Sequence, residues 1–169
     1  MTQLSTPFSI LVAIAQNNAI GLNNTLLWHI TEDLKRFKQL TLDHTIIMGL
    51  KTFYSLPVRP LPRRRTIVLA DDHNLHIEGC EMAYSINDVL RLADPHQENF
   101  ICGGGSIYRQ FINVVDTIHL TMVYKDFEAD TFFPDIDKSV FALDSESPLS
   151  TDEASGLTYQ FQTFRRTHA

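Results

Sequence analysis

Residues Phe8 to Ala15 read FSILVAIA, a run of eight in which only Ser9 is polar. The run carries three β-branched side chains, Ile10, Val12 and Ile14. A continuous apolar run of this length predicts a strand buried on both faces, which is typical of a partly parallel sheet. This strand therefore decides the fold class as α/β.

Working outward, the pattern predicts further strands over residues 44–48, 66–70, 82–84, 100–102, 117–123, 131–133 and 158–165. Helices are expected over residues 31–42, 51–56, 86–93 and 106–115, and a loop over residues 17–25. Thr31 is the expected cap of the first helix. Strands alternate with helices early and dominate later, which predicts a mixed sheet with helices on both faces.

Composition narrows the class of protein. The chain has 169 residues, 44% hydrophobic and 20% charged, which fits one soluble, globular domain. The formal net charge of −6 argues against a nucleic-acid partner. The apolar run over residues 10–15 is too short for a signal peptide or a membrane span. Cys80 and Cys102 are expected to be free thiols in a reducing compartment, hence the cytoplasm.

Asp33 lies at the start of an expected helix and shares a face with Leu34 and Phe37. Two interpretations are open from these residues alone. One is a solvated acid stabilised by the helix dipole, which is the commoner case. The other is a buried acid whose two oxygens match two adjacent N–H donors of a flat, nitrogen-rich ring. Trp28 precedes this helix and is either a core residue or the holder of a water beside the acid.

Two strand–glycine–helix junctions follow, one at Gly49 and one at residues 103–105. Each directs backbone N–H groups toward the start of a helix, where an anion is stabilised. Two such junctions suggest a cofactor with a diphosphate, although neither is a P-loop or a Rossmann fingerprint. The run over residues 63–65, three arginines, is either a solvated turn or a site for a small anion. His73 and His76 lack a matching acid or thiol cluster, so no metal site is expected.

Taken together, these stretches resemble bacterial dihydrofolate reductase from about residue 8 to residue 166. The matching stretches occur in the family's order: LVAIA, Ile20-Gly21, Trp28, the Asp33 helix, IIMG-x-KT, PLPxR, TIVL, CGGGSIY, Leu120-Thr121 and DTFFP. The resemblance implies a single domain over residues 1–169 with a core at about 8–166. It also implies a central eight-stranded, mostly parallel sheet flanked by helices.

The same resemblance implies that the protein reduces 7,8-dihydrofolate to tetrahydrofolate with NADPH, for one-carbon metabolism. Asp33 would hold the pterin and promote its protonation, assisted by Thr121 and by a water on Trp28. The ring and benzoyl pocket would be lined by Leu11, Ala13, Leu34, Phe37, Leu56, Leu61, Cys102 and Tyr108. Arg64 would bind the glutamate carboxylate of the substrate, and residues 15–30 would form a mobile loop. The family default is a monomer.

Cofactor contacts are implied for Ala13, Ile20, Gly49, Lys51, Thr52, Leu69, Gly104, Gly105, Ser106, Ile107 and Gln110, with a cis bond between Gly103 and Gly104. Three positions depart from the family at the end that holds the 2′-phosphate of NADPH. Leu50 replaces a usual Arg or Lys, Asp71 replaces a polar or basic residue, and Ala70 replaces Ser or Thr. These changes suggest a weaker preference for NADPH over NADH, unless Lys51, Arg65 or another basic residue compensates.

Three further positions depart from the family pattern. Leu27 stands where proline usually precedes the tryptophan, Arg63 replaces a frequent glycine, and Ala129 replaces a glycine in a distant loop that supports the expected mobile loop. Two other activities remain as alternatives. One is a pterin or pyrimidine reductase of the same fold. The other is a folate- or nucleotide-binding protein without turnover.

Overall fold

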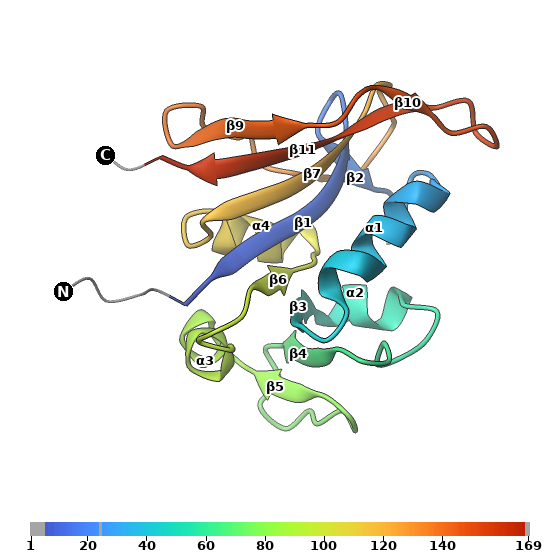
Figure 1. Cartoon of the computed structure of the whole chain (residues 1–169). Helices are drawn as coiled ribbons and strands as arrows, with labels where there is room; N and C mark the ends of the chain where they lie inside the picture. The colour runs from blue at the N-terminus through green and yellow to red at the C-terminus, as the bar shows by residue number, and fades with distance from the viewer. Residues whose placement is uncertain (1–5, 24, 168–169) are drawn as a thin grey trace.

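The computed structural model describes residues 6–23 and 25–167. Its central element is a mixed sheet (Figure 1). Its strands run in the order β10-β11-β7-β1-β6-β3-β4-β5, and β9 pairs with β11 beside this path. Their bounds are β1 Phe8–Ala15, β3 Thr45–Gly49, β4 Arg65–Leu69, β5 Glu81–Ala83, β6 Asn99–Ile101, β7 Thr117–Val123, β9 Phe141–Glu146, β10 Ser150–Thr151 and β11 Thr158–Arg166. The expected eight-stranded path is confirmed.

Strand β1 lies inside the sheet, parallel to β6 on one side and to β7 on the other. All its residues are buried except the half-buried Ala13. The pairs β3–β6, β3–β4 and β4–β5 are also parallel, whereas β11 runs antiparallel to β7. The prediction drawn from FSILVAIA is therefore confirmed.

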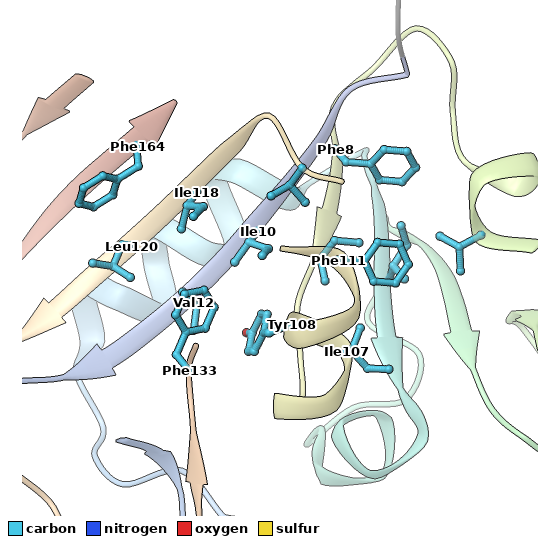
Figure 2. Close-up of a cluster of buried hydrophobic side chains, with 14 of the residues drawn as sticks. Phe8, Ile10, Val12, Ile107, Tyr108, Phe111, Ile118, Leu120, Phe133 and Phe164 are labelled. Carbon is cyan, nitrogen blue, oxygen red and sulfur yellow. The ribbon is translucent and has the colours of Figure 1, made fainter. Parts of the chain in front are cut away.

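Helices cover both faces of the sheet. Helices α3 (Ile86–Leu92) and α4 (Gly105–Phe111) pack against Ile10, Val12 and Ile14 of β1, and Figure 2 shows the α4 part of this cluster. Helices α1 (Thr31–Thr41) and α2 (Leu50–Ser55) cover the other face, where Phe37 and Phe53 join the cluster around Leu11. Alternate residues of β1 therefore face the two helical layers, as the pleat of a strand requires.

Several details differ from the sequence-based expectations. The expected loop over residues 17–25 contains β2 (Ala19–Gly21), which pairs with β8 (Thr131–Phe132) in a separate two-stranded sheet. Strands β9 and β10 were not predicted, because their residues are mostly exposed and lack apolar periodicity. Helix α4 ends at Phe111, four residues earlier than expected. Thr31 is not the cap: Ile30 precedes the helix, without a side-chain cap, and Thr31 is its first residue.

Candidate active site

The Asp33 carboxylate lies where α1 meets β7. Thr121 of β7 donates a hydrogen bond from its hydroxyl to Asp33 Oδ1 over 2.6 Å. Thr121 is buried, and Asp33 is half-buried. Burial raises the pKa of Asp33, while the hydrogen bond from Thr121 and the charge of Arg36 lower it, and the net shift is upward. Asp33 is thus not the solvated acid that residue statistics favour.

Arg36 is a neighbour of Asp33 that the sequence analysis did not single out. Its guanidinium lies 4.4 Å from the centroid of the Phe161 ring, and Phe161 pairs with Thr121 across the sheet. Burial lowers the pKa of Arg36, and Asp33 raises it in turn. The only signal in the sequence was the three-residue spacing from Asp33, which places both side chains on one side of the helix.

An apolar cluster adjoins the acid on the α1 and α2 face. Buried Leu11 and half-buried Phe37, Leu56, Leu61 and Cys102 belong to it. Ala13 pairs with Thr121 in register and is half-buried. Leu34, one residue after Asp33, is 46% exposed. The structure thus brings most of the expected pocket residues together beside Asp33.

Two of the expected residues lie differently. Tyr108 belongs to the core on the α4 face, and its hydroxyl donates a hydrogen bond of 2.9 Å to the carbonyl of Leu11 (Figure 2). Burial raises the pKa of Tyr108, and the charges of Cys102 and Asp33 raise it further. Trp28 packs on Phe127, with ring centroids 5.1 Å apart, beside the cluster around Ile30.

The three arginines of residues 63–65 have different partners. Arg63 pairs with Asp43, its Nη2 lying 2.7 Å from a carboxylate oxygen, and Arg65 pairs with Glu81. Arg64 donates to neutral oxygens, over 3.2 Å to Thr41 Oγ1 and over 2.8 Å to the Pro62 carbonyl. Among the described residues, Arg64 forms no ion pair. Its charge is therefore the least compensated of the three.

The two glycine junctions lie side by side. Strands β3 and β6 are parallel neighbours, and the Gly49 N–H donates to the Gly103 carbonyl over 2.8 Å. A Cβ on Gly49 would lie 3.0 Å from Ile107, and one on Gly105 would lie 2.6 Å from Thr131. A Cβ on Gly104 would lie 3.3 Å from the hydroxyl of Thr52, which places Thr52 beside the second junction. The Gly103–Gly104 bond is cis, as the resemblance implied.

The remaining expected cofactor residues surround these junctions. Lys51 and Ser106 are exposed in the first turns of α2 and α4, and Ser106 Oγ accepts a hydrogen bond from Gln110. Ile20 and Leu69 are half-buried and pack against the core that contains Ile107. The N–H groups in the first turn of a helix lack partners within the helix. Two adjacent first turns can therefore hold an extended anion such as a diphosphate.

The loop over residues 15–30 is tied to the segment around β8. The Asn23 N–H donates to an Asp130 carboxylate oxygen over 2.9 Å, and the Asp130 N–H donates to the Gly21 carbonyl over 3.0 Å. Asn18 donates to the Asp135 carboxylate over 2.7 Å. These contacts join stretches more than a hundred residues apart and hold the loop beside α4.

Other features of the described residues bear on the site. A cavity of about 440 Å³ lies on the α4 face, lined by Ile14, Leu120, Met122 and Phe164 among others, away from Asp33. Within residues 6–23 and 25–167, no group of three or more His, Cys, Asp and Glu side chains could hold a metal ion. No helix in that part of the chain is long and apolar enough to cross a membrane. Cys80 and Cys102 are both free, as expected.

The fold and the site define an α/β protein with a half-buried acid beside the sheet and a pair of adjacent glycine junctions at the starts of two helices. Comparison with known proteins agrees. The sequence profile of the family described as dihydrofolate reductase matches residues 7–166. The chain is 35% identical over 158 residues to a dihydrofolate reductase of Bacillus subtilis, covering 94% of each chain.

Two further relatives extend the comparison. A dihydrofolate reductase of Staphylococcus aureus is 37% identical over 153 residues, covering 90% of this chain and 94% of its own. The structure of dihydrofolate reductase from Enterococcus faecalis, complexed with NADP(H) and RAB-propyl, superposes with a TM-score of 0.89. It is 32% identical and covers 98% of this chain and 99% of its own. This chain belongs to the dihydrofolate reductase family.

Proposed function

We propose that this protein reduces 7,8-dihydrofolate to 5,6,7,8-tetrahydrofolate by hydride transfer from NADPH, and so supplies tetrahydrofolate for one-carbon metabolism. The observation that carries the proposal is the half-buried Asp33 carboxylate, hydrogen-bonded to Thr121 beside an apolar cluster. Membership of the family supports the same reaction.

Asp33 orients the pterin and assists its protonation. A carboxylate has two oxygens that accept two adjacent N–H donors, and Thr121 occupies one lone pair of Oδ1 and fixes its direction. Because burial raises the pKa of Asp33, a proton is available to the site at higher pH than an exposed carboxyl would allow. In this proposal Trp28 holds a water that relays the proton toward the ring.

The apolar cluster holds the rest of the substrate. Leu11, Ala13, Leu34 and Phe37 contact the pterin and benzoyl rings, with Leu56, Leu61, Cys102 and the hydroxyl edge of Tyr108 completing the pocket. Arg64 binds the glutamate carboxylate, which its lack of an acidic partner among the described residues supports. This arginine favours a folate substrate over the alternative of a small pterin or pyrimidine without a carboxylate tail.

The residues at the junctions fit the diphosphate of a nicotinamide dinucleotide. A Cβ at Gly49, Gly104 or Gly105 would crowd Ile107, Thr52 or Thr131, so glycine lets these segments pack closely. The N–H groups in the first turns of α2 and α4, which lack partners within their helices, would bind the diphosphate. Lys51, Thr52, Ser106 and Gln110 add polar contacts, and Ala13, Ile20, Leu69 and Ile107 add apolar ones. When bound, NADPH supplies the hydride, so the protein orients two rings and assists one proton transfer.

The loop over residues 15–30 excludes water from the reacting rings. Its contacts with Asp130 and Asp135 hold it in position, and all of them are exposed or only part-buried. Such contacts are individually weak, so the loop can open when ligands exchange.

We further propose that residues 1–169 form one domain with its core at about 8–166, that the protein is a monomer, and that it acts in the cytoplasm without nucleic-acid or membrane partners. The net charge of −6 and the two free cysteines support this assignment.

The proposed reaction is tested by mixing the purified protein with NADPH and dihydrofolate, and following the loss of NADPH absorbance while tetrahydrofolate is identified by mass spectrometry. We expect one molecule of tetrahydrofolate to form for each molecule of NADPH oxidised. Binding of dihydrofolate and NADPH without turnover would favour the alternative of a non-catalytic binding protein. Faster turnover of a pterin without the benzoyl-glutamate tail would favour the other alternative.

A further inference from the structure

The proposed function fixes the direction of the cofactor along the sheet, and the following inference rests on it. Asp33 and Thr121 mark the pterin end, at β7 and β1, and the glycine junctions lie at β6 and β3. The nicotinamide must lie beside the pterin. The adenosine half therefore extends the other way, past β3 toward the carboxyl ends of β4 and β5 (Figure 1).

The side chains at those strand ends can be placed from the register. Gly49 pairs with Leu69, and Leu69 with Ala83, so the residues that follow the three strands are neighbours. Leu50 follows β3 and packs into the apolar cluster around Met48. Ala70 follows β4 and is buried, and Asp71 comes next with its side chain exposed. The residue that follows β3 is thus apolar, and the exposed side chain beyond the end of β4 is an acid.

Nearby cations are engaged elsewhere. Arg65 lies at the start of β4, the opposite end from Asp71, and is bound by Glu81 and the Leu92 carbonyl. Arg65 therefore cannot supply the positive charge that is absent at Leu50. Arg91 pairs with Asp88, whose carboxylate also accepts the Tyr84 N–H. Among the described residues, no cation forms an ion pair with Asp71.

Lys51 is an exposed basic side chain in the first turn of α2, which follows β3. The pKa of Asp130 is lowered by hydrogen bonds from the Asn23 N–H and the Thr131 hydroxyl, and the charge of Lys51 lowers it further. In residues 6–23 and 25–167, Lys51 forms no ion pair with Asp71. A 2′-phosphate at the strand ends of β4 and β5 would meet an uncompensated carboxylate.

We propose that Asp71 and Leu50 together remove the usual advantage of the 2′-phosphate, so that this protein binds and uses NADH about as well as NADPH. An exposed carboxylate at the end of a parallel strand accepts a hydrogen bond from a ribose hydroxyl and repels a phosphate at the same place. Leu50 supplies no charge that would offset the repulsion.

The test measures dissociation constants of NADPH and NADH by calorimetry without substrate, together with kcat/KM for both. Wild type is expected to show ratios within about tenfold in both measurements. Asp71→Asn is expected to tighten NADPH and to weaken NADH, each by about threefold to tenfold, because a charge is removed and a strong acceptor lost. Leu50→Arg is expected to tighten NADPH by about tenfold or more and to leave NADH nearly unchanged.

Glu78→Gln, which removes an exposed acid from the same connector between β4 and β5, is the matched control and is expected to change neither ratio by more than about twofold. A wild-type preference for NADPH of more than about a hundredfold overturns the inference, as does Asp71→Asn changing both nucleotides equally. Neither of these two results contradicts the proposed reductase activity. Failure of both nucleotides to bind overturns the inference and the proposed function together, whereas equal binding without dihydrofolate-dependent oxidation overturns only the proposed function.

Discussion

Replacing Arg64 by glutamine is expected to weaken binding of dihydrofolate and to leave the chemical step intact. Among the residues that the structure describes, Arg64 donates to Thr41 and Pro62 and to no acid, whereas its neighbours Arg63 and Arg65 pair with acids. A hydrogen bond to a charged group contributes about 1.5–3 kcal/mol, and partial exposure favours the lower part of that range. A loss of about 2 kcal/mol corresponds to a roughly thirtyfold higher KM, since 1.4 kcal/mol is about a factor of ten.

The assay is steady-state oxidation of NADPH at varied dihydrofolate concentration, with kcat expected to stay within about twofold of wild type. Arg63→Gln is the matched control from the same run: its pair with Asp43 is exposed, and such pairs contribute about 0–1 kcal/mol. Its KM should stay within about threefold. A dihydropterin without the benzoyl-glutamate tail supplies a second control, because it lacks the carboxylate and should be bound equally by wild type and Arg64→Gln.

Two results would refute this reasoning. If KM for dihydrofolate rises less than threefold, Arg64 does not bind the carboxylate. If Arg64→Gln weakens the tailless substrate as much as the full one, the arginine acts through its bond to Thr41, as a structural residue.

Three further predictions concern the acid, the second junction and the thiols. Arg36→Met removes a charge that lowers the pKa of Asp33, so the fall in kcat with rising pH should move to higher pH; an unchanged profile would show that the two side chains are not coupled. Gly105→Ala places a Cβ 2.6 Å from Thr131, so thermal melting should show a loss of about 1–3 kcal/mol and NADPH should bind more weakly, whereas a fully stable variant with normal affinity would contradict the packing described. Desolvation raises the pKa of the half-buried Cys102 to about 12, so in a Cys80→Ser variant Cys102 should react with a thiol reagent at pH 8 at least a hundredfold more slowly than in the unfolded chain; rapid labelling would show that its surroundings do not suppress the thiolate.

Much of the fold followed from local patterns. The apolar run of β1, the helical spacing of Leu34, Phe37 and Leu40, and the glycine junctions each depend on residues close in sequence. Each predicted the start of its element to within a residue or two, although α4 ends four residues earlier than expected. Strands β2, β9 and β10 were not predicted, because they are short or exposed. Strand β2 forms because β8, more than a hundred residues away, pairs with it, and β9 and β10 form on β11.

The functional site also has a part that local sequence predicts and a part that only tertiary packing creates. The spacing of Asp33 and Phe37 placed an acid beside apolar residues, but the solvated alternative was the commoner one until the motifs around it were considered together. The contact of Asp33 with Thr121 joins residues 88 positions apart, and the approach of Arg36 to Phe161 depends on the pairing of β11 with β7. No spacing rule predicts such contacts, because tertiary packing alone creates them.

The role of Asp33 is tested most directly by replacing it with asparagine, which keeps an acceptor for Thr121 and removes the titrating proton. We expect kcat for dihydrofolate reduction at neutral pH to fall by roughly a hundredfold or more, in the range that loss of acid–base assistance produces. Because burial raises the pKa of Asp33, its ionised form destabilises the folded protein at high pH, so the variant should melt at or above the wild-type temperature. A folded Asp33→Asn protein that reduces dihydrofolate at the wild-type rate would contradict the account.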